Sequence, residues 1–471
     1  MAEAASGRGQ VVGVVAEPGM GKSRIVTELR RSLAAERLTV LEGRCLSYGS
    51  AVPYIPLTDI VRANCGITDA DSPDEVEAKI AFGLTELGID PGPRAPLLLR
   101  MMGLRDDGVE DLTPEAVKQR TFETLLAMCL NGSRRRPLLL VVEDLHWIDR
   151  VSEELLSRLV ESIQGAPLAL VCTYRPGYQA PWIQASYATQ LALPRLTLAE
   201  SHVVLRAGLG ERGADPEALE EIVHKADGNP FFLEEMARAF LEDAPTGPRQ
   251  PVPGTVHDVL LARVDRLAEE PRRVLQTASV LGREFPLRLL EAIWSGPGGL
   301  DPHLTELRRL EFIHEQGGEG EPVHVFNHAL TQDVAYQSLL SSRRARLHEA
   351  AGAAYEALYA DRLSEVYDRL AHHYSQADRA EKAVEYLGLF AESAVKGYAH
   401  AEAVEALREA LRHVDRLPPD LRDRHAASSL CAWCTRSTSS AASTKASTRC
   451  APWRPSSRGS RTRTSPGAFT C

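Results

Sequence analysis

A glycine-rich turn between a short apolar run and a helical stretch is the feature that most constrains the fold of this chain. Val11 to Val15 is an apolar run of strand length and is typical of a buried parallel strand. The loop Ala16-Glu-Pro-Gly-Met-Gly-Lys-Ser23 follows, and a helix is expected from Arg24 to about Ala35. Strand, glycine-rich loop and helix in this order indicate a P-loop, which belongs to a parallel α/β sheet.

The residue types of this loop suit the binding of phosphate groups. Gly19 and Gly21 let the backbone approach an anion without a Cβ in the way, and N–H groups at a helix N-terminus form an anion-binding nest. Lys22 is expected to reach the β- and γ-phosphates, and the Ser23 hydroxyl to ligate Mg²⁺. The predicted cofactors are ATP or ADP with Mg²⁺, and the predicted binding residues of the loop are Pro18, Gly19, Met20, Gly21, Lys22, Ser23 and Arg24.

Charged residues follow two further apolar runs of strand length. The run from Pro137 to Val142 is followed by Glu143 and Asp144, and the run from Leu168 to Thr173 leads to Arg175. Strand ends of an open α/β sheet face the crevice where ligands bind. We expect Glu143 to hold the metal together with the P-loop serine and Asp144 to orient the attacking water, although the two acids can exchange these roles. Arg175 is expected to sense the γ-phosphate.

The net charge opposes a general nucleic-acid or anionic-membrane binder. The whole chain carries 54 basic and 64 acidic residues, a net charge of −10. No apolar run approaches the ~18 residues that a membrane helix needs, and the first ten residues do not resemble a signal peptide. Eight cysteines in 471 residues are too few for a disulfide scaffold. These observations predict a cytoplasmic protein without membrane attachment, and direct DNA binding is not expected.

The composition changes abruptly near Ala426. Residues 426–471 hold eleven Ser, seven Thr and no acidic residue, so they cannot bury enough apolar surface to order themselves. The preceding 425 residues hold 47 basic and 64 acidic residues, a net charge of −17. Cys431 and Cys434 have the spacing of a redox pair or half a zinc site, but no second pair follows. Because Arg outnumbers Lys 47 to 7, as GC-rich codons favour, we hypothesise that this tail is a frameshift product.

Helical periodicity dominates the chain after the third strand. Three short helices precede a polar, Pro-rich linker at 244–253, and four amphipathic helices then lead into a Gly-rich hairpin, which fits a winged helix. From Ser341 to Leu417 the pattern is helical, and Ala383-Val-Glu recurs as Ala403-Val-Glu, as in stacked helix pairs. The expected parts are a P-loop core (1–180), a helical lid and linker (181–250), a winged helix (251–335), a TPR-like region (336–425) and a disordered or frameshifted tail (426–471).

The ordered set of motifs resembles one family of P-loop proteins, the signal-transduction ATPases with numerous domains (STAND). The likeness is to the bacterial branch found behind adenylate cyclase domains or in large transcriptional regulators. It covers roughly residues 10–420, and its motifs are Ala16–Arg24, Gly43–Gly49, Glu143-Asp-Leu-His-Trp-Ile-Asp149, Thr173-Tyr-Arg175, Gly228-Asn-Pro-Phe-Phe-Leu-Glu-Glu235 and Asn327-His328. The resemblance implies an α/β P-loop NTPase of the ASCE type, followed by an all-α lid, a winged helix and an α-solenoid.

Residue roles follow from this resemblance at the matching positions. Pro230 resembles the lid proline that packs against adenine, and His328 resembles the winged-helix histidine that contacts the β-phosphate of ADP. The helix that helps enclose the base in the family is missing before Val11, so either the start is truncated or base affinity is weakened. The chain has no cyclase domain, and adenylate cyclase activity is not expected from it.

The sequence thus favours a slow ATP hydrolase that acts as an ATP/ADP conformational switch. It would regulate a fused output module or an unidentified protein partner through its helical repeats, and a nucleotide-dependent oligomer fits this reading. One alternative is an AAA+-like remodelling ATPase, although no convincing trans arginine finger is evident in the sequence. Another alternative is a non-enzymatic helical scaffold with a degenerate nucleotide site.

Overall fold

The computed structural model describes residues 1–45, 53–68, 71–105, 108–109, 112–210, 216–242, 254–316, 322–396, 399–418 and 421–422. Several sequence predictions lie outside these residues. They concern the second half of the Gly43–Gly49 motif, the linker at 244–253, the Gly-rich turn of the hairpin and the tail with Cys431 and Cys434.

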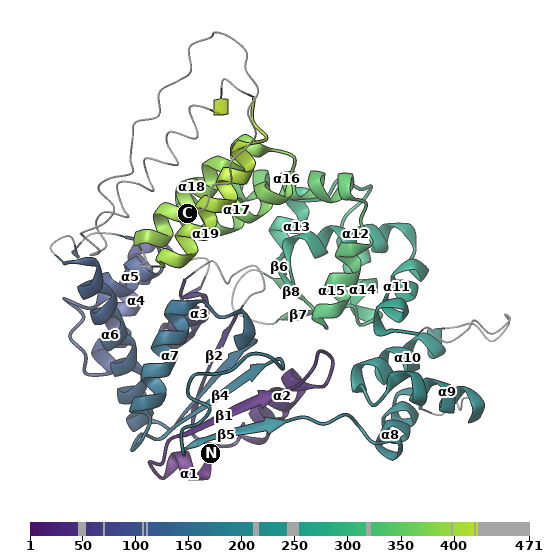
Figure 1. Cartoon of the computed structure of the whole chain (residues 1–471), viewed down its shortest axis with the longest axis horizontal. Coiled ribbons are helices and arrows are strands. Elements are labelled where there is room, and N and C mark those ends of the chain that lie inside the picture. Colours follow the sequence, from purple (N-terminus) through teal and green to yellow (C-terminus); the bar gives the residue numbers. More distant parts are fainter. Residues whose placement is uncertain are drawn as a thin grey trace, which may run out of the picture.

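A five-stranded parallel sheet forms the centre of the N-terminal part (Figure 1). Its strands are Gln10–Val15 (β1), Thr39–Arg44 (β2), Leu138–Glu143 (β3), Leu168–Tyr174 (β4) and Ala188–Ala192 (β5). Their spatial order is β2-β3-β4-β1-β5, so β4 separates the P-loop strand from the strand that ends in Glu143. The predicted α/β P-loop fold is therefore confirmed.

Helices cover both faces of this sheet, which explains the continuous apolar runs of its inner strands. Leu139 and Val141 of β3 pack with Val26 of α2 (Lys22–Ser32), whereas Leu138 and Leu140 belong to the core on the opposite face. All residues of β3 and β4 are buried. Burying one such side chain fully contributes about 1.5–3 kcal/mol, so these two strands anchor the domain.

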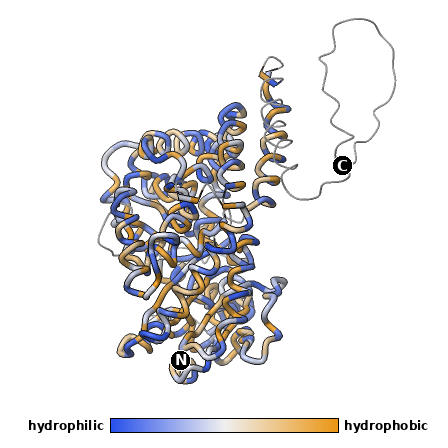
Figure 2. Tube along the Cα trace, turned by 90° about the vertical axis from the view of Figure 1, so that its left-hand side faces the viewer, coloured by the Kyte–Doolittle hydropathy of each residue, from blue (hydrophilic) through white to orange (hydrophobic). Residues whose placement is uncertain are grey.

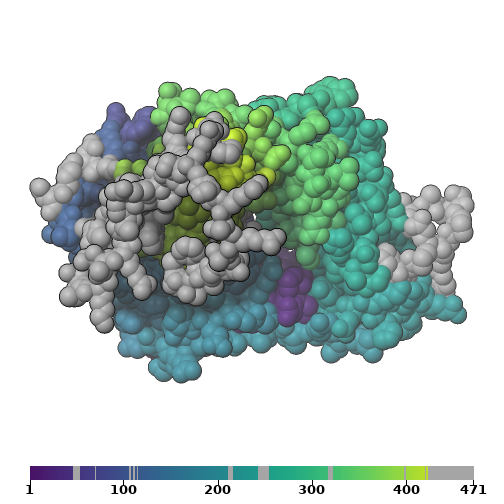
Figure 3. Space-filling model, turned by 45° about the horizontal axis from the view of Figure 1, so that its top comes forward, coloured from purple at the N-terminus to yellow at the C-terminus, as the bar shows by residue number. Residues whose placement is uncertain are grey.

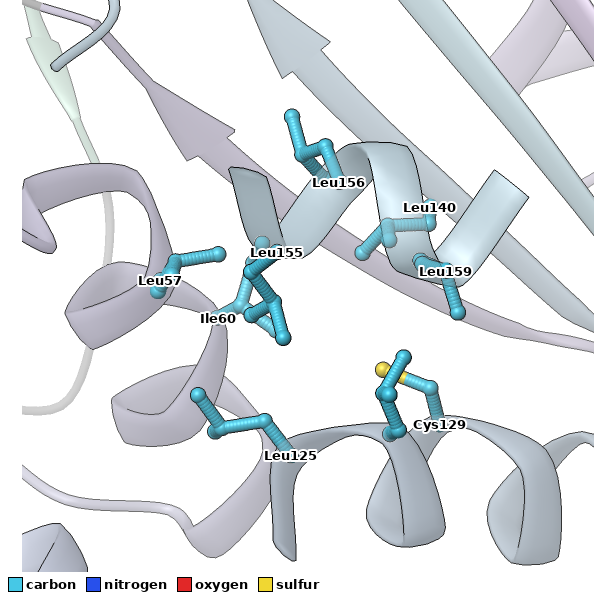
Figure 4. A pocket seen from close by; sticks show the side chains of 9 residues that line it. Leu57, Ile60, Leu125, Cys129, Leu140, Leu155, Leu156 and Leu159 are labelled. Carbon is cyan, nitrogen blue, oxygen red and sulfur yellow. The ribbon is translucent and has the colours of Figure 1, made fainter. Parts of the chain in front are cut away.

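A helical insertion between β2 and β3 supplies most of the second face. It comprises Ile55–Cys65 (α3), Pro73–Glu86 (α4), Ala95–Met101 (α5) and Pro114–Arg135 (α6). With α7 (Arg150–Ser162) and β3 it encloses a cavity of about 20 Å³, into which Leu57, Leu125, Cys129 and Leu155 point (Figure 4). The lining is hydrocarbon and one thiol, so this cavity has no polar group to orient a ligand.

Three short helices follow β5 where the sequence predicts a lid, and we call them the lid helices. They are Leu198–Leu209 (α8), Pro216–Ala226 (α9) and Pro230–Glu242 (α10). The three short helices that the sequence predicts before the linker at 244–253 are therefore present. Thr197 caps α8 in a capping box with Glu200, which fixes where this helix begins. The lid helices have an apolar core of their own, centred on Leu205, Ile222 and Leu233.

A three-stranded antiparallel sheet with five helices comes next, and we call residues 254–316 and 322–340 the three-stranded module. Its elements are Val256–Arg266 (α11), Glu269–Leu281 (α12), Glu284–Pro286 (β6), Leu287–Ile293 (α13), Asp301–Arg309 (α14), Ile313–Gln316 (β7), Val323–Phe326 (β8) and Ala329–Gln337 (α15). β8 lies between β6 and β7. The expected strand pair is therefore present, and β6 adds a third strand that the sequence pattern did not indicate.

A buried ion pair joins the lid helices to the three-stranded module. Glu235 of α10 and Arg263 of α11 bond to each other and are only 1% and 2% exposed. Arg263 also donates to the carbonyl oxygen of Leu310 (2.9 Å), and Arg238 donates to the second oxygen of Glu235 (2.9 Å). Breaking such a pair leaves a buried charge without compensation, so these two parts are expected to move as one body.

The C-terminal helices lie beside the core, and successive helices pack antiparallel to each other. They are Ser341–Leu358 (α16), the 3₁₀ segment Ala360–Val366 (η2), Tyr367–Gln376 (α17), Ala380–Lys396 (α18) and His400–Val414 (α19). Apolar and polar residues alternate along most helices in Figure 2, as amphipathic helices require. The helix stack touches the insertion of the core, where Arg100 donates to the carbonyl oxygen of Lys396 (3.4 Å). None of the helices within the described ranges is long and apolar enough to cross a membrane.

Two buried histidines couple α16 to α17. Nδ1 of His348 lies 2.9 Å from Nδ1 of His373, and the Tyr336 hydroxyl lies 2.9 Å from Nε2 of His348. One nitrogen of the Nδ1 pair must accept the hydrogen bond, so both rings cannot be cations. Burial is the main reason why the pKa of His348 falls to about 3 and that of His373 falls well below its ordinary value.

Acidification is therefore expected to destabilise the helical region. Below pH ~6.5 these two histidines become protonated in the unfolded chain but stay neutral in the folded chain. The free energy of unfolding therefore falls by up to about 1.4 kcal/mol per pH unit for each histidine. Urea unfolding at pH 7.5 and pH 5.5 measures the effect. Other groups titrate in this range, so the matched comparison is His348→Gln, whose stability should fall less steeply with pH. An unchanged pH dependence in that variant contradicts the assignment.

Candidate functional site

The glycine-rich loop leaves β1 and turns into α2 at two positions with left-handed backbone. Gly19 has φ 80° and Gly21 has φ 88°, a region that side chains with a Cβ rarely adopt. The N–H of Ile25 bonds the carbonyl of Gly21 (3.0 Å), so α2 begins directly behind the loop, at Lys22. The first N–H groups of α2 therefore face the loop, as an anion site at a helix N-terminus requires.

Lys22 lies across the loop that it follows. Its Nζ donates to the carbonyl oxygens of Ala16 (2.8 Å) and Glu17 (3.1 Å). Burial lowers the pKa of Lys22; the attraction of Asp144 opposes this shift, and the nearby cation Arg175 adds to it. The ammonium group is thus held by neutral carbonyls beside a second cation, and a polyanion would relieve the repulsion between the two.

Ser23 and Glu143 are brought together as predicted for a metal pair. The Ser23 hydroxyl donates to Oε2 of Glu143 at 2.8 Å, and the Glu143 side chain is buried, with 4% of the residue exposed. A hydroxyl and a carboxylate oxygen at this spacing match the hard oxygen ligands that Mg²⁺ prefers. The described residues contain no cluster of three His, Cys, Asp or Glu ligands, so phosphate and water oxygens would have to complete a magnesium shell.

Asp144 follows β3 in an unusual backbone conformation. Its φ is 59°, and its N–H donates to the hydroxyl of Thr173 on the neighbouring strand β4 (3.0 Å). This bond ties the residue to the end of β4, the strand that lies between β3 and β1. Burial and then the neighbouring charge of Glu143 raise the pKa of Asp144, while Arg283 lowers it. A carboxylate with a raised pKa is better able to accept a proton from water.

Arg175 follows β4 at the same edge of the sheet. Its guanidinium lies over the ring of Trp147, 5.0 Å from the centroid, which holds the side chain in place. It is close enough to Lys22 and to Asp333 of α15 to influence the pKa of both groups. The structure thus places Arg175 between the P-loop and the three-stranded module.

The predicted lid motif contacts the loop directly. Nδ2 of Asn229 donates to the carbonyl of Pro18 (3.3 Å), and the N–H of Phe231 donates to the carbonyl of Gly19 (3.3 Å). A Cβ on Gly19 would lie 2.9 Å from Oδ1 of Asn229, so the approach depends on glycine. Pro230 is the first residue of α10 and lies between these two contacts.

His328 reaches the loop through one intermediate side chain. It precedes α15, and its ring centroid lies 4.0 Å from that of Phe231, whose N–H bonds Gly19. Burial, assisted by Arg238 and Arg283, lowers the pKa of His328 to about 4, so the imidazole is neutral near pH 7. His328 thus contacts the lid, through the ring of Phe231.

The site also contains residues to which the sequence prediction assigned no role. His146 has both ring nitrogens buried without a hydrogen-bond partner among the described residues, and burial lowers its pKa to about 4. Arg44, the last residue of β2, lies 3.8 Å from Glu143 and pairs with Glu284 of β6. Arg44 ends a parallel strand just as Glu143 does. That position in the sequence could have identified it as a candidate site residue.

The site lies where three parts of the chain meet. The core contributes the loop and the strand ends, the lid contributes Asn229 and Phe231, and the three-stranded module contributes Arg283 and Glu284. In Figure 3 a purple patch from the N-terminal part of the chain is visible at the junction between teal and green segments. The arrangement is suited to a charged ligand that interacts electrostatically with all three parts.

The family comparison agrees with this geometry. Residues 1–171 match the AAA ATPase domain family. An uncharacterized protein of Rhizobium meliloti (strain 1021) is 29% identical over 358 residues, which are 73% of this chain and 34% of that protein. The chain therefore spans about a third of the length of this curated relative.

Two solved structures show looser likeness. A STAND protein with a tetratricopeptide repeat sensor from Pyrococcus horikoshii is 12% identical with a TM-score of 0.44, over 88% of this chain and 63% of that chain. Drosophila ORC bound to AT-rich DNA and Cdc6 is 11% identical with a TM-score of 0.21, over 72% and 89% of the two chains. The family match, together with the fold described above, confirms the predicted AAA-like P-loop ATPase domain, and the helices described above follow it in the chain.

Proposed function

Starting from the AAA ATPase domain of residues 1–171, we propose that this chain is an ATP/ADP-dependent conformational switch of the STAND kind. One observation carries the proposal: lid and core are hydrogen-bonded at the phosphate loop itself, through Asn229 to Pro18 and Phe231 to Gly19. A ligand that enters this loop must change or use these contacts. The occupancy of the loop therefore biases the position of everything that is attached to the lid.

The loop and its neighbours supply the binding energy in this proposal. Backbone N–H groups of the loop and of the first turn of α2 surround the phosphates, and Lys22 exchanges its carbonyl partners for phosphate oxygens. Arg175 supplies a second cation at the same strand edge. Mg²⁺ held by Ser23 and Glu143 would neutralise charge on the phosphate oxygens.

Asp144 is the proposed acceptor for the proton of the attacking water. Its burial, its raised pKa and its fixed backbone support this role, and the bond between Ser23 and Glu143 supports giving the metal to Glu143 and not to Asp144. Catalysis would consist mainly of positioning and electrostatics. We propose slow turnover, because a switch requires each nucleotide state to persist.

The remaining parts would transmit the nucleotide state. We propose that residues 251–335 are a winged helix and that residues 336–425 are a TPR-like surface for a protein partner or output module. In this proposal Pro230 packs against adenine, and His328 registers the β-phosphate of ADP from behind Phe231. A cytoplasmic location and the use of ATP, ADP and Mg²⁺ belong to the same proposal.

Calorimetric titration with ATP and ADP, each with and without Mg²⁺, tests the proposed function. We expect binding of both nucleotides, and tighter binding of ATP when Mg²⁺ is present. Failure of correctly folded protein to bind either nucleotide at millimolar concentration would falsify the switch and leave a helical scaffold. Activity per chain that rises with protein concentration would instead favour a ring-forming remodelling ATPase.

Replacing Asp144 with asparagine is expected to separate binding from hydrolysis. The amide keeps the size of the side chain and loses the proton acceptor, so single-turnover hydrolysis should fall about 10²–10⁴-fold. The affinity for ATP should change by less than about threefold. The matched control is Asp265→Asn, an exposed carboxylate on α11 that pairs only loosely with Arg272 (3.8 Å). Equal hydrolysis rates in wild type and Asp144→Asn would show that Asp144 does not activate the water and would assign that role to Glu143 instead.

A further inference from the structure

A cluster of charges links the metal pair of the core to the three-stranded module. Arg44 ends β2, and its guanidinium lies 3.8 Å from Oε1 of Glu143, the carboxylate whose other oxygen accepts the Ser23 hydroxyl. The same guanidinium forms an ion pair with Glu284 at the start of β6. The side chain of Arg44 is 24% exposed, so this pair is partly shielded from solvent. One arginine is thus shared between an acid of the core and an acid of the module.

Glu284 is the acid that can draw Arg44 away from the metal pair. Glu42, also near Arg44 at 3.7 Å, is already bonded to Arg30 at 2.8 Å. Without Glu284, the closest remaining partner of Arg44 that is not already paired with another arginine is Glu143. Two cations cannot share that carboxylate without repulsion, so Arg44 and Mg²⁺ would compete for it.

We propose that Glu284 is a positioning residue for the magnesium site and acts on it through Arg44. The inference rests on the proposed function, because it concerns Mg²⁺ at Ser23 and Glu143. Docking of the three-stranded module neutralises Arg44 and leaves Glu143 available to the metal. By linkage, occupation of the metal site favours the docked module by the same factor. Because Glu284 lies outside the ATPase domain, the affinity of the site for Mg²⁺ would depend on the position of the three-stranded module.

The neighbouring Arg283 is expected to have the opposite effect on the same site. Its backbone carbonyl accepts the N–H of Phe326 (2.9 Å), which ties it to β8, and its Nε is buried without a hydrogen-bond partner among the described residues. Its charge lies close to Glu143 and Asp144, since both acids influence its pKa. A cation at this position should repel Mg²⁺, so variants at these two adjacent positions are expected to shift Mg²⁺ affinity in opposite directions.

The test is a Mg²⁺ titration of nucleotide binding, with fluorescent ADP at fixed concentration and the whole chain. Outer-sphere partners of metal ligands typically change metal affinity 10–100-fold, so Glu284→Gln is expected to raise the Mg²⁺ midpoint about 10-fold. Binding of the nucleotide in EDTA should stay unchanged. Arg283→Gln should lower the midpoint. Glu315→Gln, which removes an exposed acid of β7 that pairs with Arg308, is the matched control and should leave the midpoint unchanged.

A double-mutant cycle separates this role from a structural one. Arg44→Gln removes the cation that competes once Glu284 is gone, so it should change the Mg²⁺ midpoint little by itself and abolish the effect of Glu284→Gln in the double variant. A variant that only loosened the module would show no such rescue. If wild type binds nucleotide with a Mg²⁺ dependence that Glu284→Gln leaves unchanged, this inference is wrong and the switch proposal stands. If wild type binds no nucleotide, the proposed function fails first.

Discussion

Replacing Lys22 with alanine is expected to abolish measurable ATP turnover. The ammonium group is held beside the loop by two carbonyl oxygens, ready to exchange them for phosphate oxygens. A hydrogen bond to a charged group contributes about 1.5–3 kcal/mol, so the affinity for ATP should fall about 10- to 150-fold. Loss of a cation that stabilises developing charge costs a further 10²–10³-fold in turnover at saturating ATP. Calorimetry and single-turnover hydrolysis measure the two effects separately.

The matched control for Lys22 is Lys79→Ala on α4. Lys79 also binds a backbone carbonyl, that of Gly66 at 2.8 Å, and an acid, Asp71, but it lies in the helical insertion. Its loss should leave nucleotide binding unchanged. The fold of the Lys22 variant should be intact, because burial already lowers the pKa of this lysine and its charge does not stabilise the core. Normal ATP affinity in Lys22→Ala would overturn the site assignment.

Replacing Arg263 with alanine is expected to have the largest effect on stability. Its partner Glu235 is 1% exposed and would keep a charge in the interior, with Arg238 as the remaining cation at 2.9 Å. Removing one member of a buried ion pair costs about 3–5 kcal/mol. The carbonyl of Leu310 would also lose its donor. Chemical denaturation followed by the fluorescence of Trp294, in the same module, measures the change.

Two comparisons make the stability prediction specific. Arg309→Ala removes an exposed arginine that pairs with Glu306 within α14, and it should cost less than about 1 kcal/mol. Removing both charges together, as Glu235→Leu with Arg263→Met, should recover most of the loss, because no buried charge is then left alone. A cost below about 1 kcal/mol for Arg263→Ala would mean that the lid helices and the three-stranded module are not joined by this pair.

The nucleotide-binding core was the part most open to prediction from sequence. β3 and β4 are buried on both faces, so their residues read as continuous apolar runs with charged residues at the ends. The loop from Ala16 to Ser23 lies directly after β1, as expected. Some boundaries differ by a few residues: α2 spans Lys22–Ser32 where a helix from Arg24 to about Ala35 was expected. β3 extends to Glu143, which bonds Ser23 from the last position of the strand and not from the turn after it. The roles of Pro230 and His328 remain predictions.

Other elements escaped prediction for physical reasons. β6 is three residues long and its pattern is too short to differ from a loop, although it carries Glu284 into the site. The helices α3–α6 form an insertion that a sheet tolerates at a loop, and no rule of strand order requires them. The ion pair between Arg44 and Glu284 joins residues 240 positions apart, so no local pattern could indicate it.

The joint between the lid helices and the three-stranded module also bears on how fast nucleotides come and go. A lid of three short helices could swing open alone within microseconds to milliseconds, but this lid is tied to its neighbour by Glu235 and Arg263. In the proposed switch, entry to the phosphate loop would then require the larger body to lift and to break its own contacts to the core. Exchange would be slow for that reason, and the interval between ATP arrival and ADP departure would act as a timer set by the interface.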